Sequence, residues 1–361
     1  MPITEIVDKQ MPSLTEWLEK AGFVETEEFR QEDNTKRDRL EILFQETGLE
    51  YDRPAKFKAN DLKNKTAIFQ NFLNKAKDEQ CALRLLPTTP GLPKLRVRGK
   101  TLKENLIWFE NQDIDAEQYK VEIVPHNDHC KYSATFLIND HGIIGEIIKG
   151  LHWQLTQGFH QNPPIYFSFD FHRWNFSKAD NEAEKWAKQA VASLSIPLDK
   201  QKNIQKKIKA EFNSYGYLNG YFEFAVWPTD KILFFDYNRI IYKILKDVKP
   251  VTATNSQLEL SGICANAGKA TGTAKIVLDP AHTDFSDGDI LICPMTMIDY
   301  VPLMKKASGI ITEQGSILSH AAIVARELKK PCLVGVKGVL EKIKDGQNIT
   351  LNANNGQIIL N

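Results

Sequence analysis

The sequence has 361 residues, of which 42% are hydrophobic, enough to pack the cores of two or three domains. Basic and acidic side chains number 46 each, so the formal net charge is zero. A neutral chain lacks the basic field of a nucleic-acid binder, and no apolar run approaches the roughly 20 residues that cross a bilayer. We therefore expect neither nucleic acid nor membrane as a partner.

The cysteines and the N-terminus indicate a cytoplasmic protein. Five cysteines are scattered without a CxxC pair, which favours free thiols over a disulfide framework. The first 20 residues are polar and contain no apolar signal-peptide core. We expect a reducing compartment, the cytoplasm.

The first 80 residues carry the spacing of amphipathic helices. Apolar residues recur every three or four positions in 15–23 and 65–79, which predicts a helix in each segment. The intervening segment 52–61 (DRPAKFKAND) is interpreted as a connection.

From Cys81 onward the sequence changes to short apolar runs that are typical of strands. Segment 87–100, with three prolines, two glycines and several cations, predicts a loop. The last two runs, joined by a short turn, predict a hairpin. We expect strands at 81–87, 120–125, 133–139, 142–148, 165–174, 220–228 and 231–245, and helices at 181–194 and 199–216.

Segment 247–257 (DVKPVTATNSQ) has little apolar content and is the best candidate for a linker. Short apolar strands and glycine turns resume after it, with one clear helix at 319–330. The expected boundaries are therefore 1–80, 81–246, a linker at 247–257, and a second domain at 258–361.

The helix at 319–330 begins with a serine and a histidine. Ser319 is a good N-cap, and His320 would occupy the first turn. Free N–H groups and the helix dipole favour an anion there, and imidazole is a nucleophile near neutral pH. Arg326 is left free to approach that anion. On position alone, a capping or surface histidine is the more common alternative.

Segment 312–335 (TEQGSILSHAAIVARELKKPCLVG) resembles the phosphohistidine signature of the phosphoenolpyruvate-utilising (PEP-utilising) enzymes, such as phosphoenolpyruvate synthase, pyruvate phosphate dikinase and rifampin phosphotransferase. Segments 262–277 and 289–315 resemble the preceding parts of the same mobile domain, in the same order. The resemblance implies that residues 258–361 form a swivelling β/β/α domain in which His320 carries a phosphoryl group.

Two positions depart from that signature. The family usually has a second glycine where Ser316 stands, and often threonine or cysteine where Leu318 stands. Because Leu318 has no hydroxyl, we expect Ser319 and the backbone to supply the hydrogen bonds to the phosphoryl group.

Residues 81–246 resemble a diverged ATP-grasp module, and residues 1–80 would be the helical region of its shortened first lobe. The resulting fold class is α/β (multidomain α+β), with ATP-grasp-like lobes before the phosphohistidine domain. The resemblance implies that Arg84 binds nucleotide phosphates, that Glu146 occupies an acidic position of the nucleotide site and that Arg239 faces a phosphate.

A run of cations follows Arg84. It could cradle a triphosphate, or it could be a solvated basic loop. Its members are Lys94, Arg96, Arg98 and Lys100, and the expected nucleotide-binding set includes Arg98 and Lys100. Lys56 and Lys58 are candidates for the lysine that the family places early in the nucleotide site.

The expected metal is Mg²⁺, which prefers oxygen ligands and keeps substrate phosphates in its shell. In the family a Glu and a following Gln hold it, which implies Glu223 as one ligand; Tyr237 stands at the Gln position, with Asp236 beside it. Since a strand alternates its faces, Asp236 can be the second ligand if the register shifts by one residue.

These expectations describe an ATP- and Mg²⁺-dependent phosphotransferase of the dikinase type. ATP would phosphorylate His320, and the domain would swing on its linker to an unidentified acceptor, a pyruvate-like or other small molecule bound by this chain or by a partner protein. One alternative is a nucleotide-binding regulatory protein without turnover, which the missing PEP-binding barrel and the departures at Tyr237, Ser316 and Leu318 favour. Another is a carrier subunit whose partner chain supplies the acceptor site.

Overall fold

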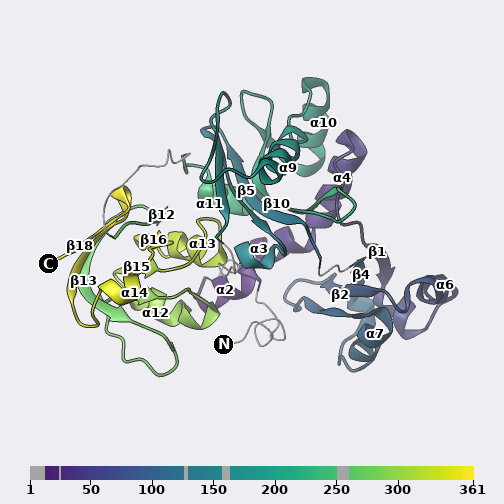
Figure 1. Cartoon of the computed structure of the whole chain (residues 1–361). Coiled ribbons are helices and arrows are strands. Elements are labelled where there is room, and N and C mark those ends of the chain that lie inside the picture. The colour runs from purple at the N-terminus through teal and green to yellow at the C-terminus, as the bar shows by residue number, and fades with distance from the viewer. Residues whose placement is uncertain (1–12, 24–25, 126–128, 157–162, 250–259) are drawn as a thin grey trace.

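The computed structural model describes residues 13–23, 26–125, 129–156, 163–249 and 260–361. The described strands form three sheets, which belong to a small lobe, a central domain and a C-terminal domain (Figure 1). The expected α/β class, with several sheets, is therefore confirmed. No helix among the described residues is long and apolar enough to cross a bilayer.

Three N-terminal helices lie where the domains meet (Figure 1). They are α2 (Leu14–Lys20), α3 (Thr26–Asn34) and α4 (Lys36–Thr47). Helix α2, which the apolar spacing predicted, begins with a capping box in which Ser13 and Glu16 bond each other's backbone N–H groups. Helix α4 ends at Gly48, whose φ of 80° is easily adopted by glycine.

The small lobe is a four-stranded antiparallel sheet with helices packed on one face. In chain order it contains β1 (Ala55–Lys58), α5 (Ala59–Lys63), α6 (Ala67–Ala76), β2 (Gln80–Pro87), β3 (Leu95–Thr101), α7 (Leu102–Glu110) and β4 (Tyr119–Pro125). Helices α6 and α7 lie on the outer side of the lobe, so the other face of its sheet is turned inward (Figure 1).

Two sequence predictions for this lobe are wrong. The presumed connection 52–61 contains β1 and the start of α5, and the presumed loop 87–100 contains β3. Both are edge strands of the sheet, and their lysine and arginine side chains hide the strand pattern. The expected boundary at residue 80 consequently falls at the start of β2, inside the lobe.

The central domain has strand order β11-β10-β5-β6-β7-β8, with β9 paired to β10. Helices α4, α9 and α10 cover one face, over a core rich in phenylalanine. The strands are β5 (Tyr132–Asn139), β6 (Gly142–Lys149), β7 (Ile165–Phe169), β8 (Trp174–Phe176), β9 (Glu211–Phe212), β10 (Leu218–Val226) and β11 (Ile232–Asn238). The helices are α8 (Trp153–Thr156), α9 (Asn181–Ala192), α10 (Leu198–Ile208) and α11 (Arg239–Leu245).

The end of this domain also differs from the sequence prediction. Segment 231–245 is strand β11 followed by helix α11, because the Asn238 side chain caps the helix by accepting the N–H groups of Ile240 and Ile241. The helix expected at 199–216 ends at Ile208, and Lys209 takes a left-handed conformation with φ of 51°.

The C-terminal domain has strand order β12-β16-β15-β14-β13-β17-β18, with β13 to β16 parallel to one another. Its strands are β12 (Ile263–Asn266), β13 (Lys269–Ile276), β14 (Ile290–Cys293), β15 (Gly309–Thr312), β16 (Cys332–Val334), β17 (Asn348–Asn352) and β18 (Gln357–Leu360). Its helices are α12 (Val301–Lys306), α13 (His320–Glu327) and α14 (Val339–Lys342).

One hydrophobic cluster joins the N-terminal helices, the central domain and the C-terminal domain. It includes Trp17 of α2, Tyr221 on the inner face of the central sheet, Leu245 of α11 and Ile323 of α13. Helix α13 is thus packed between α2 and α11 (Figure 1). Val248, at the start of the expected linker, packs against this cluster, whereas positions 250–257 of that linker lie outside the described residues.

Candidate functional site

His320 is the first residue of α13, as the sequence predicted. Ser319 is the N-cap: its Oγ accepts the Ala322 N–H at 3.3 Å and donates to the Ser316 carbonyl at 2.8 Å. The imidazole of His320 is half-buried and meets the edge of the Trp17 indole, with ring centroids 6.3 Å apart and planes at 72°. The histidine therefore faces the junction of the three parts.

The surroundings keep His320 neutral. Burial lowers the pKa of His320 to about 3, the positive charges of Arg96 and Lys36 add to this effect, and Asp33 opposes it. An unprotonated imidazole has a lone pair for attack on phosphorus at neutral pH. Two cations therefore act on the His320 ring: Arg96 from β3 of the small lobe and Lys36 from α4.

A cluster of ion pairs surrounds Lys36, the first residue of α4. Its Nζ lies 3.0 Å from Asp33 and 3.4 Å from Asp236, and Lys94 Nζ lies 2.6 Å from Asp33. Attraction to Asp236 and Asp33 raises the pKa of Lys36 in spite of its burial. The cluster thus holds two ammonium groups against two carboxylates, and the Lys36 charge acts on His320.

A row of polar side chains crosses the inner face of the central sheet. Asp236, Glu223, Thr135, Glu146 and Tyr166 are successive cross-strand partners on β11, β10, β5, β6 and β7. Directly paired residues share a face, so all five point toward the C-terminal domain.

The register of the β10–β11 pair decides whether Asp236 or Tyr237 lies beside Glu223. Glu223 pairs directly with Asp236, and a bulge follows at Glu223/Phe224. Tyr237 turns to the opposite face, where its ring stacks on Phe222 in the phenylalanine core. Asp236, not Tyr237, therefore stands beside Glu223.

The residues present fit a divalent cation. Burial and the neighbouring Asp236 charge raise the pKa of Glu223 to about 7, whereas Lys36 lowers it. Asp236 Oδ1 is buried without a hydrogen-bond partner in the described structure. The unused Asp236 oxygen and the adjacent Glu223 carboxylate attract a cation, although the described residues contain no group of three or more metal-ligating side chains. Phosphate oxygens and water would have to complete the shell of Mg²⁺.

The inner face of the small lobe carries part of the predicted cationic run. Arg84 is the cross-strand partner of Arg96 on one side and of Glu122 on the other. Arg84 Nη1 is buried without a hydrogen-bond partner in the described structure. Arg98 follows Arg96 on β3; its side chain keeps an exposed part, but desolvation by its surroundings and the Arg96 charge lower its pKa to about 10.

Lys100 does not join this set. A bulge in the β2–β3 pairing, with Gly99 at a φ of 76°, makes Lys100 the partner of Cys81. Cys81 packs in the core under α7, and its partner Lys100 lies on the same face of the sheet, opposite the face that carries Arg84. The Lys100 side chain is exposed there. The predicted role of Lys100 in the site is not supported by this geometry.

Arg239 is bound by Glu32, a carboxylate that the sequence pattern did not identify. Its Nε and backbone N–H both donate to Glu32 Oε1, at 3.0 and 2.8 Å. Arg239 also lines a groove of about 720 Å³ between α3, the 87–92 loop and the start of α11, a size that suits a small-molecule ligand.

Arg326 lies in the last turn of α13, so it does not reach the helix start where His320 lies. Burial lowers its pKa, and its charge acts on Cys264 and Cys332. Six residues along a helix correspond to about 9 Å of rise, which separates Arg326 from the N-terminal anion position. In this arrangement the predicted catalytic role of Arg326 is not met.

Glu146 contacts the histidine loop instead of the small lobe that carries the cations. Its Oε1 accepts the Ile317 N–H at 3.0 Å. Burial raises the pKa of Glu146 to about 7, and hydrogen bonds from Ser316 and Ile317 oppose the rise. Leu318, the other departure from the family signature, is buried in the cluster between the domains.

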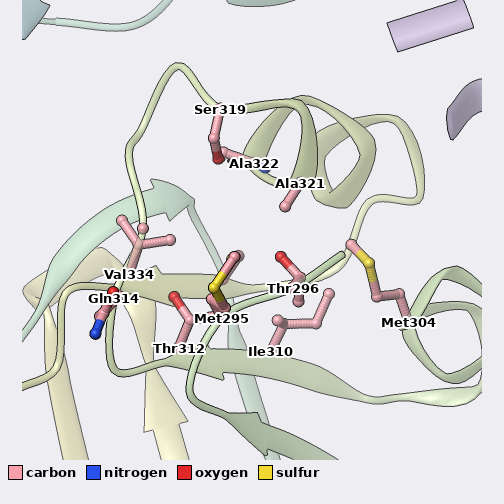
Figure 2. A pocket seen from close by; sticks show the side chains of 12 residues that line it. Met295, Thr296, Met304, Ile310, Thr312, Gln314, Ser319, Ala321, Ala322 and Val334 are labelled. Carbon is pink, nitrogen blue, oxygen red and sulfur yellow. Dashed lines mark hydrogen bonds between the residues drawn. The ribbon is translucent and has the colours of Figure 1, made fainter. Parts of the chain in front are cut away.

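The side of α13 turned toward its own sheet offers no ligand site. A cavity of about 10 Å³, the size of one water, lies between α13 and β15 (Figure 2). Ser319, Ala321 and Ala322 line it from the helix, and Ile310 and Thr312 line it from the strand (Figure 2). His320 is therefore approached from the side of α2 and the small lobe.

Sequence reasoning missed Lys36, Asp33 and Trp17. Lys36 meets Asp236 from 200 positions away, Trp17 meets His320 from 303 positions away, and Asp33 meets Lys94 from 61 positions away, contacts that periodicity does not show. Lys56 and Lys58, the candidates for an early nucleotide lysine, lie on β1, and Lys56 forms an exposed pair with Asp38 at 2.7 Å.

Comparisons with known proteins cover the segment that contains His320. Residues 285–356 match the family model described as PEP-utilising enzyme, mobile domain. An uncharacterised phosphotransferase of Bacillus subtilis, YvkC, is 38% identical over 120 residues, which are 33% of this chain and 14% of that protein. Phosphoenolpyruvate synthase of Aquifex aeolicus is 40% identical over 118 residues, 32% of this chain and 14% of that enzyme.

The alignments therefore span about one seventh of these curated relatives. Among solved structures, the VanG D-Ala:D-Ser ligase of Enterococcus faecalis is similar over 57% of this chain and 52% of its own. Its identity is 13% and its TM-score is 0.30, values too low to define the fold of this chain.

Proposed function

We propose, on the premise that residues 285–356 are the mobile domain of a PEP-utilising enzyme, that this chain is an ATP-dependent phosphotransferase that forms a phosphohistidine at His320. One observation carries the proposal. The neutral imidazole of His320 faces Lys36 and Arg96, in the cluster that also contains the paired carboxylates.

The chemistry follows from these positions. A ring nitrogen of His320 attacks phosphorus, the bond from that phosphorus to the leaving oxygen breaks, and the electron pair departs with the leaving group. By analogy with the family, the β-phosphoryl group goes to His320, AMP leaves, and water releases the γ-phosphate. Lys36, Arg96 and Arg84 offset the charge on the phosphates. Glu223 and Asp236 would hold Mg²⁺, which neutralises phosphate oxygens when bound.

The phosphoryl group then needs an acceptor, a pyruvate-like or other small molecule bound by this chain or by a partner protein. His320 is enclosed by α2 and α11 in the described arrangement. Transfer to a second site therefore requires the C-terminal domain to move, because in-line attack demands close positioning at each site.

The test is the intact mass of the protein after incubation with ATP and Mg²⁺, kept at neutral or alkaline pH. We expect one phosphoryl adduct on the wild type and on His282→Ala, a control that removes an exposed histidine of the same domain. His320→Ala should show no adduct, and AMP should appear only with the adduct.

The alternative is a regulatory protein or carrier subunit that binds nucleotide without turnover. ATP binding with no adduct on the wild type would contradict the proposed phosphotransferase and favour this alternative. An adduct retained by His320→Ala would show that another residue is the carrier.

A further inference from the structure

Two neighbouring side chains of the central sheet hold the loop that precedes His320. Glu146 Oε1 accepts the Ile317 N–H at 3.0 Å, and the Tyr166 hydroxyl donates to the Gly315 carbonyl at 3.4 Å. Glu146 and Tyr166 are direct cross-strand partners on β6 and β7. They therefore act on both ends of one three-residue loop.

The loop transmits this contact to the histidine. Gly315 has a φ of 146°, and an added Cβ would lie about 3.0 Å from Thr312 Oγ1, so the loop conformation requires glycine. The Ser316 carbonyl accepts a hydrogen bond from the Ser319 hydroxyl, and Ser319 caps α13. A shift of the loop would thus move the N-cap and His320 together.

The side chain of Glu146 is fully buried, and a buried carboxyl is costly unless it is hydrogen-bonded. Among the described residues its hydrogen-bond partners come from the C-terminal domain, while its sheet neighbours Thr135 and Tyr166 flank it. Docking of the C-terminal domain therefore gives Glu146 Oε1 a hydrogen-bond donor, while Glu146 Oε2 stays buried without a partner in the described structure.

We propose that Glu146 and Tyr166 are positioning residues that dock the Gly315–Ile317 loop and so present His320 to the donor site. The inference rests on the proposed phosphotransferase function for its purpose, but the docking contact itself can be measured without nucleotide. It assigns Glu146 to recognition of the C-terminal domain, not to the nucleotide.

The first experiment is hydrogen–deuterium exchange of the Ile317 amide in the full chain without nucleotide. Loss of its acceptor in Glu146→Ala should speed exchange about tenfold. Glu146→Gln, which keeps an oxygen acceptor, should restore much of the protection. Thr135→Val, on the same row but without a bond to the loop, is the control and should match the wild type.

Glu146→Ala leaves a buried cavity and could unfold the sheet, so Tyr166→Phe provides a milder variant. It should also speed exchange in the 315–317 loop, since only the hydroxyl is lost. Unchanged exchange in both Tyr166→Phe and a folded Glu146→Ala would overturn the proposal.

The second experiment is single-turnover phosphorylation of His320. In Tyr166→Phe and Glu146→Ala the rate of adduct formation should fall while ATP affinity stays the same, and Glu146→Gln should recover the rate. Equal loss of ATP affinity would assign these residues to the nucleotide site and refute the docking role. If the wild type forms no adduct, the proposed function fails. The exchange data still decide whether Glu146 and Tyr166 dock the Gly315–Ile317 loop.

Discussion

The edge of the Trp17 ring faces His320, with centroids 6.3 Å apart, although the two residues are 303 positions apart in the sequence. Trp17 is fully buried, and its helix also reaches the small lobe through Glu16, 3.7 Å from Arg96, and the C-terminal domain through Lys20, 2.8 Å from Asp299. Helix α2 therefore contacts both the small lobe and the C-terminal domain, and its Trp17 covers one side of His320.

Replacing Trp17 tests this enclosure. Trp17→Ala should lower the free energy of unfolding by about 3–5 kcal/mol, the usual cost of deleting a large buried aromatic side chain. Because the ring also shields His320, the pKa of His320 should rise toward its ordinary value, as followed by NMR. Trp17→Phe should show a smaller change in both quantities, and a pKa that stays low in Trp17→Ala would contradict the shielding role.

Lys36 provides a prediction for the nucleotide step. Lys36→Met removes a buried cation beside Asp236 and His320, so the rate of His320 phosphorylation should fall about 100-fold, the typical cost of one charge-stabilising donor. Lys100→Met is the matched control, since Lys100 is exposed on the other face of its sheet, and its rate should stay near that of the wild type. Equal rates for the two variants would remove Lys36 from the site.

The paired carboxylates predict opposite effects on activity and stability. Asp236→Asn should abolish Mg²⁺-dependent phosphorylation, because a ligand charge is lost. Without Mg²⁺ its thermal unfolding temperature should equal or exceed that of the wild type, since Glu223 and Asp236 repel each other in a buried place and Lys36 keeps Asp33 as a partner. A marked drop in that temperature would show that Asp236 serves the fold and not the cation.

The low pKa of His320 predicts a pH dependence of stability. The unfolded chain binds a proton on this histidine near pH 6.5, whereas the folded chain does so near pH 3. The stabilising contribution is therefore complete above pH 6.5 and is lost as the pH falls below it, by up to about 1.4 kcal/mol per pH unit.

Urea unfolding at pH 7.5, 6.5 and 5.5 would measure the effect as the difference between wild type and His320→Asn. The wild type should lose stability relative to the variant on acidification. Parallel pH profiles would mean that His320 is accessible to protons in the folded protein, contrary to the enclosed position described above.

The sequence predicted the elements whose pattern is local. Short apolar runs bounded by turn residues identified β5, β6 and β10, and Ser319 followed by apolar residues three and four apart identified α13. Helix α11 was missed although Asn238 is a good N-cap, because its aromatic and β-branched residues also suit a strand.

The site was harder to predict, because its charges are paired over long distances. Glu32 neutralises Arg239 from 207 positions away, and Lys36 joins Asp236 from 200 positions away. A one-residue bulge decided that Asp236 lies beside Glu223, and another turned Lys100 away from Arg84. Bulges and long-range partners are set by tertiary packing, which a single sequence does not record.

The apolar interface between α2, α11 and α13 adds a free-energy cost to any movement of the C-terminal domain away from the central domain. Departure would wet Trp17, Leu245 and Ile323, at about 25 cal/mol for every Å² of apolar surface bared. This cost is offset if the C-terminal domain buries the same apolar surface at a second docking site. The acceptor site that receives His320 should therefore carry an apolar patch beside its reactive group. Without such a site, the domain should remain almost entirely in the docked state described here.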